Sequence, residues 1–176
     1  MTKGTIMWFE MRKESLGFLS HAPVVHTAEA AIAAPRNAVF GALAEPRGWK
    51  HWFPGVREAS YASPPPYGVG TVREANVGGT RWVEELIAWE DPKQWGWTVL
   101  RASVPFAQAQ VELFEFMEAG DLTRVRWTLA LEPRLLSRLA APLAGGMISR
   151  LLRQAMENLA AYLERNEGNE RPTTRR

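Results

Sequence analysis

The feature that most constrains the fold is a long amphipathic stretch near the end of the chain, from Met147 to Arg165. Apolar residues recur within it at helical steps, so they share one face of an α-helix. They are Ile148, Leu151, Leu152, Ala155, Leu159, Tyr162 and Leu163, with Met156 at the edge. No proline interrupts the stretch, and charged side chains occupy the opposite face. The sequence therefore predicts one long helix whose apolar face the rest of the chain must cover.

Glycines mark the expected limits of this helix. Gly168 follows the last apolar residue and is expected to end the helix. Upstream, the apolar residues from Leu136 to Leu143 are out of phase with the main stripe, and Gly145-Gly146 lies where the phase changes. A glycine pair either kinks a helix or allows another backbone to come close. We expect a short leading segment, a break at the pair, and then the main helix.

The segments before this helix have strand character and follow one another at hairpin spacing. Apolar residues alternate within them, and turn-forming residues such as Gly78-Gly79 separate them. The expected strands span residues 24–32, 56–62, 69–77, 80–89, 94–102, 107–117 and 122–131. Two short helices, at residues 37–43 and 47–53, are expected after the first strand.

Strands joined by short turns pair antiparallel, and a sheet with one apolar face has to bury it. The long C-terminal helix is the largest partner available for that face. The predicted fold class is therefore α+β. It is a curved antiparallel sheet of about six to seven strands wrapped around the C-terminal helix, with two short helices after the first strand.

A chain of 176 residues favours a single domain. We expect residues 1–22 to be an N-terminal extension, residues 23–165 to be the domain, and residues 166–176 to be a disordered basic tail. The sequence makes no prediction of the oligomeric state.

Composition excludes several classes of function. Cysteine is absent, which excludes disulfides, thiolate catalysis and cysteine metal sites, and fits a reducing, cytoplasmic location. The net charge is only +2 and the basic residues form no stripe, so we expect no nucleic-acid partner. No apolar run is long enough for an integral membrane segment, and the N-terminus does not read as a signal peptide. Eight tryptophans suit either a plain core or a site that grips a small molecule.

Four stretches of the sequence resemble the SRPBCC (START-related, helix-grip) superfamily. More narrowly, they are similar to its polyketide cyclase/dehydrase and lipid-transport family. The stretches are AIAAPRNAVFGALAEPRGWKHWFPGV, YGVGTVREA, EELIAWEDPKQWGWTV and GDLTRVRWTLALEP, and the resemblance covers about residues 24–165. It implies a cavity between the sheet and the long helix, entered near the short helices. Because this superfamily serves carriers, cyclases, hydrolases and regulators alike, the resemblance favours a fold more than a ligand.

The implied cavity has ten candidate wall residues. They are Trp52, Phe53, Trp97, Phe106, Phe114, Phe116, Trp127, Met147, Leu151 and Ala155. Alternation along the strands supports inward positions for Trp97 and Trp127. It leaves open which face of its strand carries Phe114 and Phe116, and Glu112 would share that face. Each aromatic residue suits a plain core as well as a ligand wall.

The weak catalytic candidates are Arg73, Glu84, Arg101 and Glu112. Glu84 and Glu85 are adjacent on a strand and point to opposite faces, so one of them can face the cavity. Two-residue steps from Trp97 would bring Arg101 to the cavity mouth, and alternation with Thr71 would do the same for Arg73. An ion pair on the solvent side of the strands is the alternative for both, so the sequence leaves their direction open. An inward Glu112 among aromatic residues would have a raised pKa and suit acid/base work, but an outward position is equally compatible with the pattern.

Other kinds of chemistry lack their motifs. There is no Gly-x-Ser-x-Gly nucleophile elbow, and the three histidines are not at metal-binding spacing, so we expect no metal and no cofactor.

Three hypotheses for function follow. The first is binding of a small hydrophobic ligand such as a lipid, isoprenoid or polyketide, with transport of that ligand as a possible extension of the same role. The second is a cyclase or dehydratase that uses the Arg and Glu candidates in the same cavity. The third is a protein-interaction module with Trp8, Phe9, Trp49 and Trp52 as exposed anchors.

Overall fold

The structure, a computed structural model, describes residues 6–138 and 141–170. Its centre is an antiparallel sheet of eight strands in the order β2-β8-β7-β6-β5-β4-β3, with β1 paired to β6. The strands are β1 (Phe9–Glu10), β2 (Val24–Ile32), β3 (Val56–Tyr61), β4 (Val72–Val77), β5 (Thr80–Glu90), β6 (Gln94–Ala102), β7 (Ala107–Ala119) and β8 (Leu122–Pro133). The helices are η1 (Leu16–Ser20), α1 (Arg36–Ala44), η2 (Pro46–His51), α2 (Leu135–Arg138) and α3 (Ala141–Glu170).

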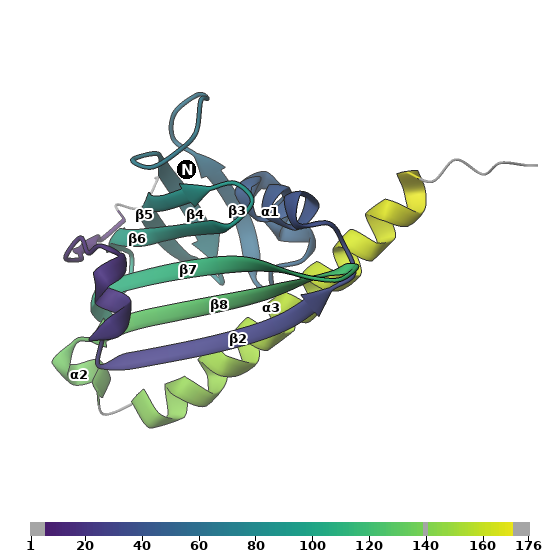
Figure 1. Cartoon of the computed structure of the whole chain (residues 1–176). Coiled ribbons are helices and arrows are strands. Elements are labelled where there is room, and N and C mark those ends of the chain that lie inside the picture. The colour runs from purple at the N-terminus through teal and green to yellow at the C-terminus, as the bar shows by residue number, and fades with distance from the viewer. Residues whose placement is uncertain (1–5, 139–140, 171–176) are drawn as a thin grey trace, which may run out of the picture.

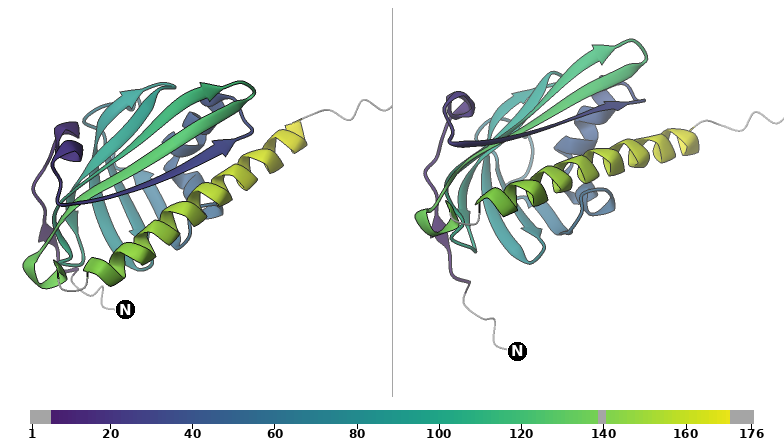
Figure 2. Two further views of the ribbon diagram at one scale, coloured as in Figure 1. Left: turned by 60° about the horizontal axis from the view of Figure 1, so that its bottom comes forward. Right: turned by 90° about the horizontal axis from the view of Figure 1, so that it is seen from below.

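The sheet curves around α3, which runs along its concave side (Figures 1 and 2). The predicted α+β fold class is confirmed, and the strands from β2 to β8 begin and end close to their expected residues. The β4–β5 turn shows why the strand limits could be predicted from the sequence. Gly78 and Gly79 have φ angles of 60° and 93°, which residues with a Cβ rarely adopt, so this pair specifies a tight two-residue hairpin.

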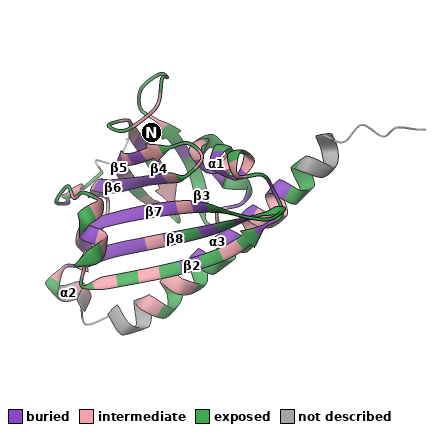
Figure 3. Ribbon diagram, viewed as in Figure 1, coloured by how far each residue is buried: buried purple, intermediate pink, exposed green. Residues whose placement is uncertain are grey.

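The concave face of the sheet and the apolar face of α3 form the core. Buried residues line β7 and β8 (Figure 3), and α3 buries Leu152, Ala155, Met156, Leu159 and Leu163 against the sheet. The helical periodicity of the sequence therefore identified this face correctly. The first half of the stripe is less completely buried than the second half, since Leu151 is 37% exposed.

Helix α3 is longer than expected at both ends. It begins at Ala141 and runs through Gly145-Gly146, and it continues past Gly168 to Glu170. The expected break at the glycine pair was therefore wrong, and the alternative role of the pair applies. A Cβ at Gly145 would lie 3.3 Å from Cε1 of His26, so the glycine lets α3 approach β2 closely. An internal glycine costs a helix only about 1 kcal/mol, which the packing of α3 offsets. The last part of the expected tail, residues 171–176, lies outside the described residues.

The described part of the N-terminal segment is attached to the sheet at two places. β1 pairs with the end of β6, where Phe9 lies opposite Ala102. Phe18 of η1 is 2% exposed and packs against Ala109, Val111 and Ala130. The sequence did not predict β1, because a two-residue strand forms only where a distant strand offers its edge.

Within the described residues, no helix is long and apolar enough to cross a membrane.

Candidate ligand pocket

A pocket of about 570 Å³ lies between the concave face of the sheet and the first half of α3. This volume is within the range of small-molecule sites. Its lining is mainly apolar and consists of Trp49, Phe53, Ala75, Val77, Thr80, Trp82, Glu84, Trp97, Val104, Phe106, Gln110, Glu112, Trp127, Leu129, Leu131, Met147, Ile148, Leu151 and Leu152. The lining residues most open to solvent are Met147, at 72% exposed, and Val104 and Leu151, both at 37%. The rim therefore lies between α3 and the β6–β7 loop, rather than near the short helices as expected.

The ten candidate wall residues divide into two groups. Six of them line the pocket: Phe53, Trp97, Phe106, Trp127, Met147 and Leu151. The other four, Trp52, Phe114, Phe116 and Ala155, are buried in the core outside the pocket lining.

Strand β7 explains this division. Glu112, Phe114 and Phe116 share its concave face, which settles the alternation that the sequence left open. Phe116 lies 5.7 Å from the ring of Phe40 on α1, so that helix fills the space opposite this end of the strand. The pocket therefore covers only the part of β7 that α1 does not reach.

Arg73 and Glu84 form a buried ion pair across β4 and β5. They are direct partners in the strand register. Nε of Arg73 donates to Oε2 of Glu84 at 2.7 Å, and Nη2 lies 2.6 Å from the same oxygen without making a second directed hydrogen bond. Arg73 is 0% exposed and Glu84 is 6% exposed. Glu84 lines the pocket, whereas its neighbour Glu85 points to the convex face and bonds Lys13.

Three tryptophans enclose the guanidinium of Arg73. Its central carbon lies 4.2 Å from the ring centroids of Trp49 and Trp97, and 4.9 Å from that of Trp95. Indole faces attract cations, and the attraction is strongest where water is excluded. Arg73 does not belong to the pocket lining, so the indoles and Glu84 separate its charge from the pocket.

Glu112 presents a second carboxyl group to the pocket. Its Oε1 accepts a hydrogen bond from Nε2 of Gln110 at 2.6 Å, and its Oε2 accepts one from Nε1 of Trp127 at 2.8 Å. Burial, and secondarily the nearby charge of Glu84, raise the pKa of Glu112 to about 8, against the opposing effect of these hydrogen bonds and of Arg73. Glu112 is therefore mainly protonated at neutral pH. The sequence had left its direction open.

Arg101 does not join this group, and of the two directions that the sequence left open it takes the one away from the pocket. Val83 pairs with Arg101 and Glu84 pairs with Val99, so one step along β5 spans two steps along β6. This bulge reverses the alternation that places Trp97 and Val99 on the concave face. The guanidinium of Arg101 instead lies 4.7 Å from the ring centroid of Trp8, in the N-terminal segment.

Several residues of the pocket were not among the candidates. Gln110 follows from the alternation of β7 once Glu112 is inward. Trp49 and Trp82 carried no signal beyond their residue type, because their positions depend on how η2 and β5 meet the sheet. The indole Nε1 atoms of Trp82 and Trp97 are buried and have no hydrogen-bond partner among the described residues.

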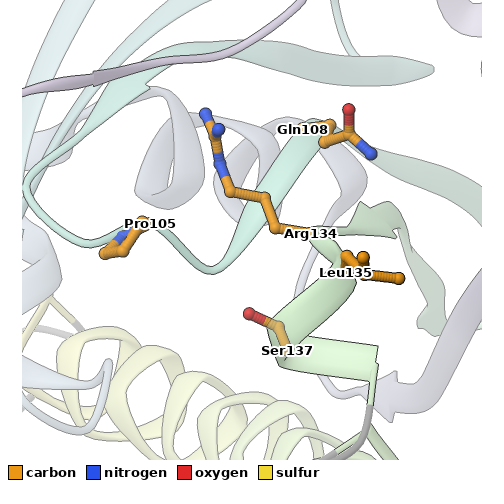
Figure 4. Close-up of a pocket in the computed structure, with 5 residues that line it drawn as sticks. All are labelled: Pro105, Gln108, Arg134, Leu135 and Ser137. Atoms are coloured by element: carbon orange, nitrogen blue, oxygen red, sulfur yellow. The ribbon is translucent and has the colours of Figure 1, made fainter.

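A second cavity, of about 520 Å³, lies beside α2 and is lined by Pro105, Gln108, Arg134, Leu135 and Ser137 (Figure 4). The side chain of Arg134 reaches along it, but Nε donates to the carbonyl of Ala107 and Nη2 to that of Glu10. This arginine therefore ties the start of β7 to β1. Elsewhere, among residues 6–138 and 141–170, no group of three or more metal-ligating side chains is placed to hold a metal ion.

Comparisons with known proteins agree with this architecture. An uncharacterized protein of Mycobacterium tuberculosis is 25% identical over 157 residues, which cover 89% of this chain and 94% of that protein. A crystal structure of the Zhui aromatase/cyclase from a Streptomyces species aligns with a TM-score of 0.70 at 15% identity, covering 82% of this chain and 95% of that one. A START superfamily protein from Mycobacterium smegmatis aligns with a TM-score of 0.61 at 17% identity, covering 82% and 97% of the two chains.

At these identities the two structures show a shared fold, in agreement with the expected helix-grip architecture. The family model described as polyketide cyclase/dehydrase and lipid transport matches residues 23–164. Since that match spans most of the chain, the protein belongs to the polyketide cyclase/dehydrase and lipid transport family.

Proposed function

We propose that this protein binds a small, largely apolar molecule in the pocket between the sheet and α3. The observation that carries the proposal is a pocket of about 570 Å³ with a mainly apolar lining in an otherwise packed core. A globular core closes voids of this size unless something occupies them, because each unfilled contact loses dispersion energy. A ligand that fills the pocket would restore those contacts.

The polar groups of the pocket indicate that the ligand also has a polar part. Glu84, Gln110 and Glu112 lie on the wall, and each of these side chains is almost fully buried. Buried polar groups are usually hydrogen-bonded, so a ligand with oxygen or nitrogen atoms near these side chains would satisfy them. The six wall residues named above are proposed as its apolar contacts.

Tryptophan fluorescence tests the proposal directly, because Trp49, Trp82, Trp97 and Trp127 line the pocket. Titration with a panel of fatty acids, isoprenoids and polycyclic aromatic compounds should give a saturable change for at least one class. Mass spectrometry of an organic extract of the purified protein should then identify a related compound. If the folded protein shows no saturable change with any class, the proposal fails.

The second candidate is an enzyme that uses Glu112 as an acid or base. The observation in its favour is the pKa of Glu112, raised to about 8, in a carboxyl group that lines the pocket. Such a group can donate a proton near neutral pH and take one back. Given a compound that is turned over, Glu112→Gln should reduce turnover by about a hundredfold or more. Unchanged turnover in Glu112→Gln would contradict a role for Glu112 as acid or base, and ligand binding would be the remaining proposal.

The third hypothesis, a protein-interaction module, loses its main support. Trp49 and Trp52 are each only 3% exposed, so neither can anchor a partner. Trp8 and Phe9 are half-buried, and Trp8 stacks with Arg101.

A further inference from the structure

The pocket wall carries two buried carboxyl groups, and only one of them is paired with a cation. Its wall has two carboxyl groups, Glu84 and Glu112, and among the described lining residues there is no arginine or lysine. Glu84 already has its counter-charge, because Arg73 contacts it at 2.6 Å from behind the wall. Glu112 has hydrogen-bond donors but no cation bound to it among the described residues. One buried carboxyl group is therefore matched by a cation and the other is not.

The same walls already hold one buried cation. The guanidinium of Arg73 lies between the rings of Trp49 and Trp97, with Glu84 as its partner. Both tryptophans also belong to the pocket lining, together with Trp127, whose N–H binds Glu112. Aromatic faces combined with a carboxylate are a favourable environment for a desolvated cation. The surroundings of Glu112 repeat this combination without the cation.

The hydrogen bonds of Glu112 leave room for a third partner. Each of its oxygens accepts one bond from the protein, which orients the carboxyl group and leaves one further position on each oxygen. Because Glu112 lines the pocket, a donor on a ligand can take such a position. An anionic group there would face the carboxylate of Glu84 and would disfavour ionisation of Glu112, and it would find no cation in the described lining, which excludes Arg73.

We propose that the pocket selects amphipathic amines, in which an apolar body fills the cavity and a protonated nitrogen pairs with Glu112. This inference rests on the proposed ligand-binding function and specifies its ligand class.

Binding of an amine should change the protonation state of Glu112. Glu112, with a pKa of about 8, is mainly protonated at pH 7, and a cation beside it favours the ionised form. The charged groups that act on Glu112 are Glu84 on β5 and Arg73 on β4, while the α3 wall contributes apolar residues: Met147, Ile148, Leu151 and Leu152. Amine binding should therefore release a proton near pH 7, whereas binding of a neutral alcohol should release none.

Three probes with the same apolar body separate the contributions: decylamine, decan-1-ol and decanoate, each kept below its aggregation concentration. Calorimetry at pH 7 should show decylamine binding at least about tenfold more tightly than decan-1-ol, with decanoate the weakest. Repeating the titration in buffers of different ionisation enthalpy should reveal the released proton. In Glu112→Gln the amine-to-alcohol affinity ratio should fall to within about twofold of one.

The control variant is Glu115→Gln, on the same strand, which is outside the pocket lining and should keep the wild-type ratio. Decan-1-ol binding as tightly as decylamine to the wild-type protein would overturn the amine inference and leave the proposed function standing. If none of the three probes bound and the fluorescence panel also gave no response, the proposed function itself would fail. Should Glu112→Gln not fold, the wild-type ratio and the proton release decide the question.

Discussion

The concave side of the sheet has a solid end and a hollow end, although the same strands supply both. At the solid end, Phe114 and Phe116 stack with each other, and Phe116 meets Phe40 from α1. Glu112 and Gln110 precede Phe114 on the same face of β7. They lie at the hollow end, where they face the pocket. Strand alternation decides which side chains face inward, but the element opposite decides whether they become core or wall.

The opposing elements account for the difference. Phe40 of α1 is 3% exposed and fills the space over the solid end. Over the hollow end lies the first half of α3, where Leu151 of the apolar stripe and the neighbouring Met147 remain open to solvent. The stripe that the sequence presents as one continuous surface is therefore used in two ways. Its second half seals the core, and its first half forms one side of the pocket.

The sharpest way to break this comparison is to truncate one phenylalanine at each end. Phe114→Ala should lower the free energy of unfolding by about 3–5 kcal/mol, because a fully buried ring leaves a cavity. Phe106→Ala should cost about 1 kcal/mol or less, since this half-buried ring borders space that is already open. Urea denaturation measures both. Equal costs would mean that the two ends do not differ in packing.

The buried ion pair provides the next largest effect. Arg73→Met should lower the free energy of unfolding by about 3 kcal/mol, because it leaves the carboxylate of Glu84 buried without its cation. Arg126→Met is the matched control. It removes the exposed pair with Glu29, in which both side chains are 46% exposed, and should cost far less stability than Arg73→Met.

Adding Glu84→Gln to Arg73→Met tests the reason for the cost. The double variant should recover part of the lost stability, because no uncompensated buried charge is left. A double variant less stable than Arg73→Met would argue that the cost comes from lost packing between the tryptophans.

The third prediction concerns pH at the hollow end. The pKa of Glu112 is about 8 in the folded protein and has its ordinary, lower value in the unfolded chain. At a pH between these two values, Glu112 is protonated in the folded state and ionised in the unfolded state. This contribution is therefore present at low pH and declines as the pH rises through 8. The wild-type protein should lose about 1 kcal/mol of stability per pH unit from pH 5 to 8, relative to Glu112→Gln.

Thermal or urea unfolding of both proteins at several pH values measures that difference. Glu115→Gln, outside the pocket, should keep the wild-type pH dependence. Parallel pH profiles for wild type and Glu112→Gln would show that Glu112 titrates like an ordinary carboxyl group.

The smallest stability effect is expected at the rim. Leu151→Trp should change the free energy of unfolding by less than about 0.5 kcal/mol, because the new ring enters open space. The same ring should weaken ligand binding about tenfold, because it fills part of the pocket. Gln154→Trp places the same ring on an exposed part of α3 outside the pocket lining and should leave affinity unchanged. Calorimetry with a ligand found in the panel makes the comparison. Unchanged affinity in Leu151→Trp would place the bound ligand elsewhere.

The sequence by itself determined the order and type of nearly all elements, the antiparallel pairing and the buried face of α3. These depend on local signals: two-residue and 3.6-residue periodicity, and glycine and proline at turns. The positive φ angles of Gly78 and Gly79 illustrate such a signal, since the residue type alone specifies the turn. The inward positions of Trp97 and Trp127 followed from the same alternation.

Only the tertiary structure decided the division into core and pocket, the direction of Arg101 and the pairing of Arg73 with Glu84. Each depends on two segments distant in the chain. A single extra residue in β6 turned Arg101 to the convex face, and α1 rather than β7 determined that Phe116 is core. Periodicity describes one element at a time, whereas a cavity is the space that several elements together fail to fill.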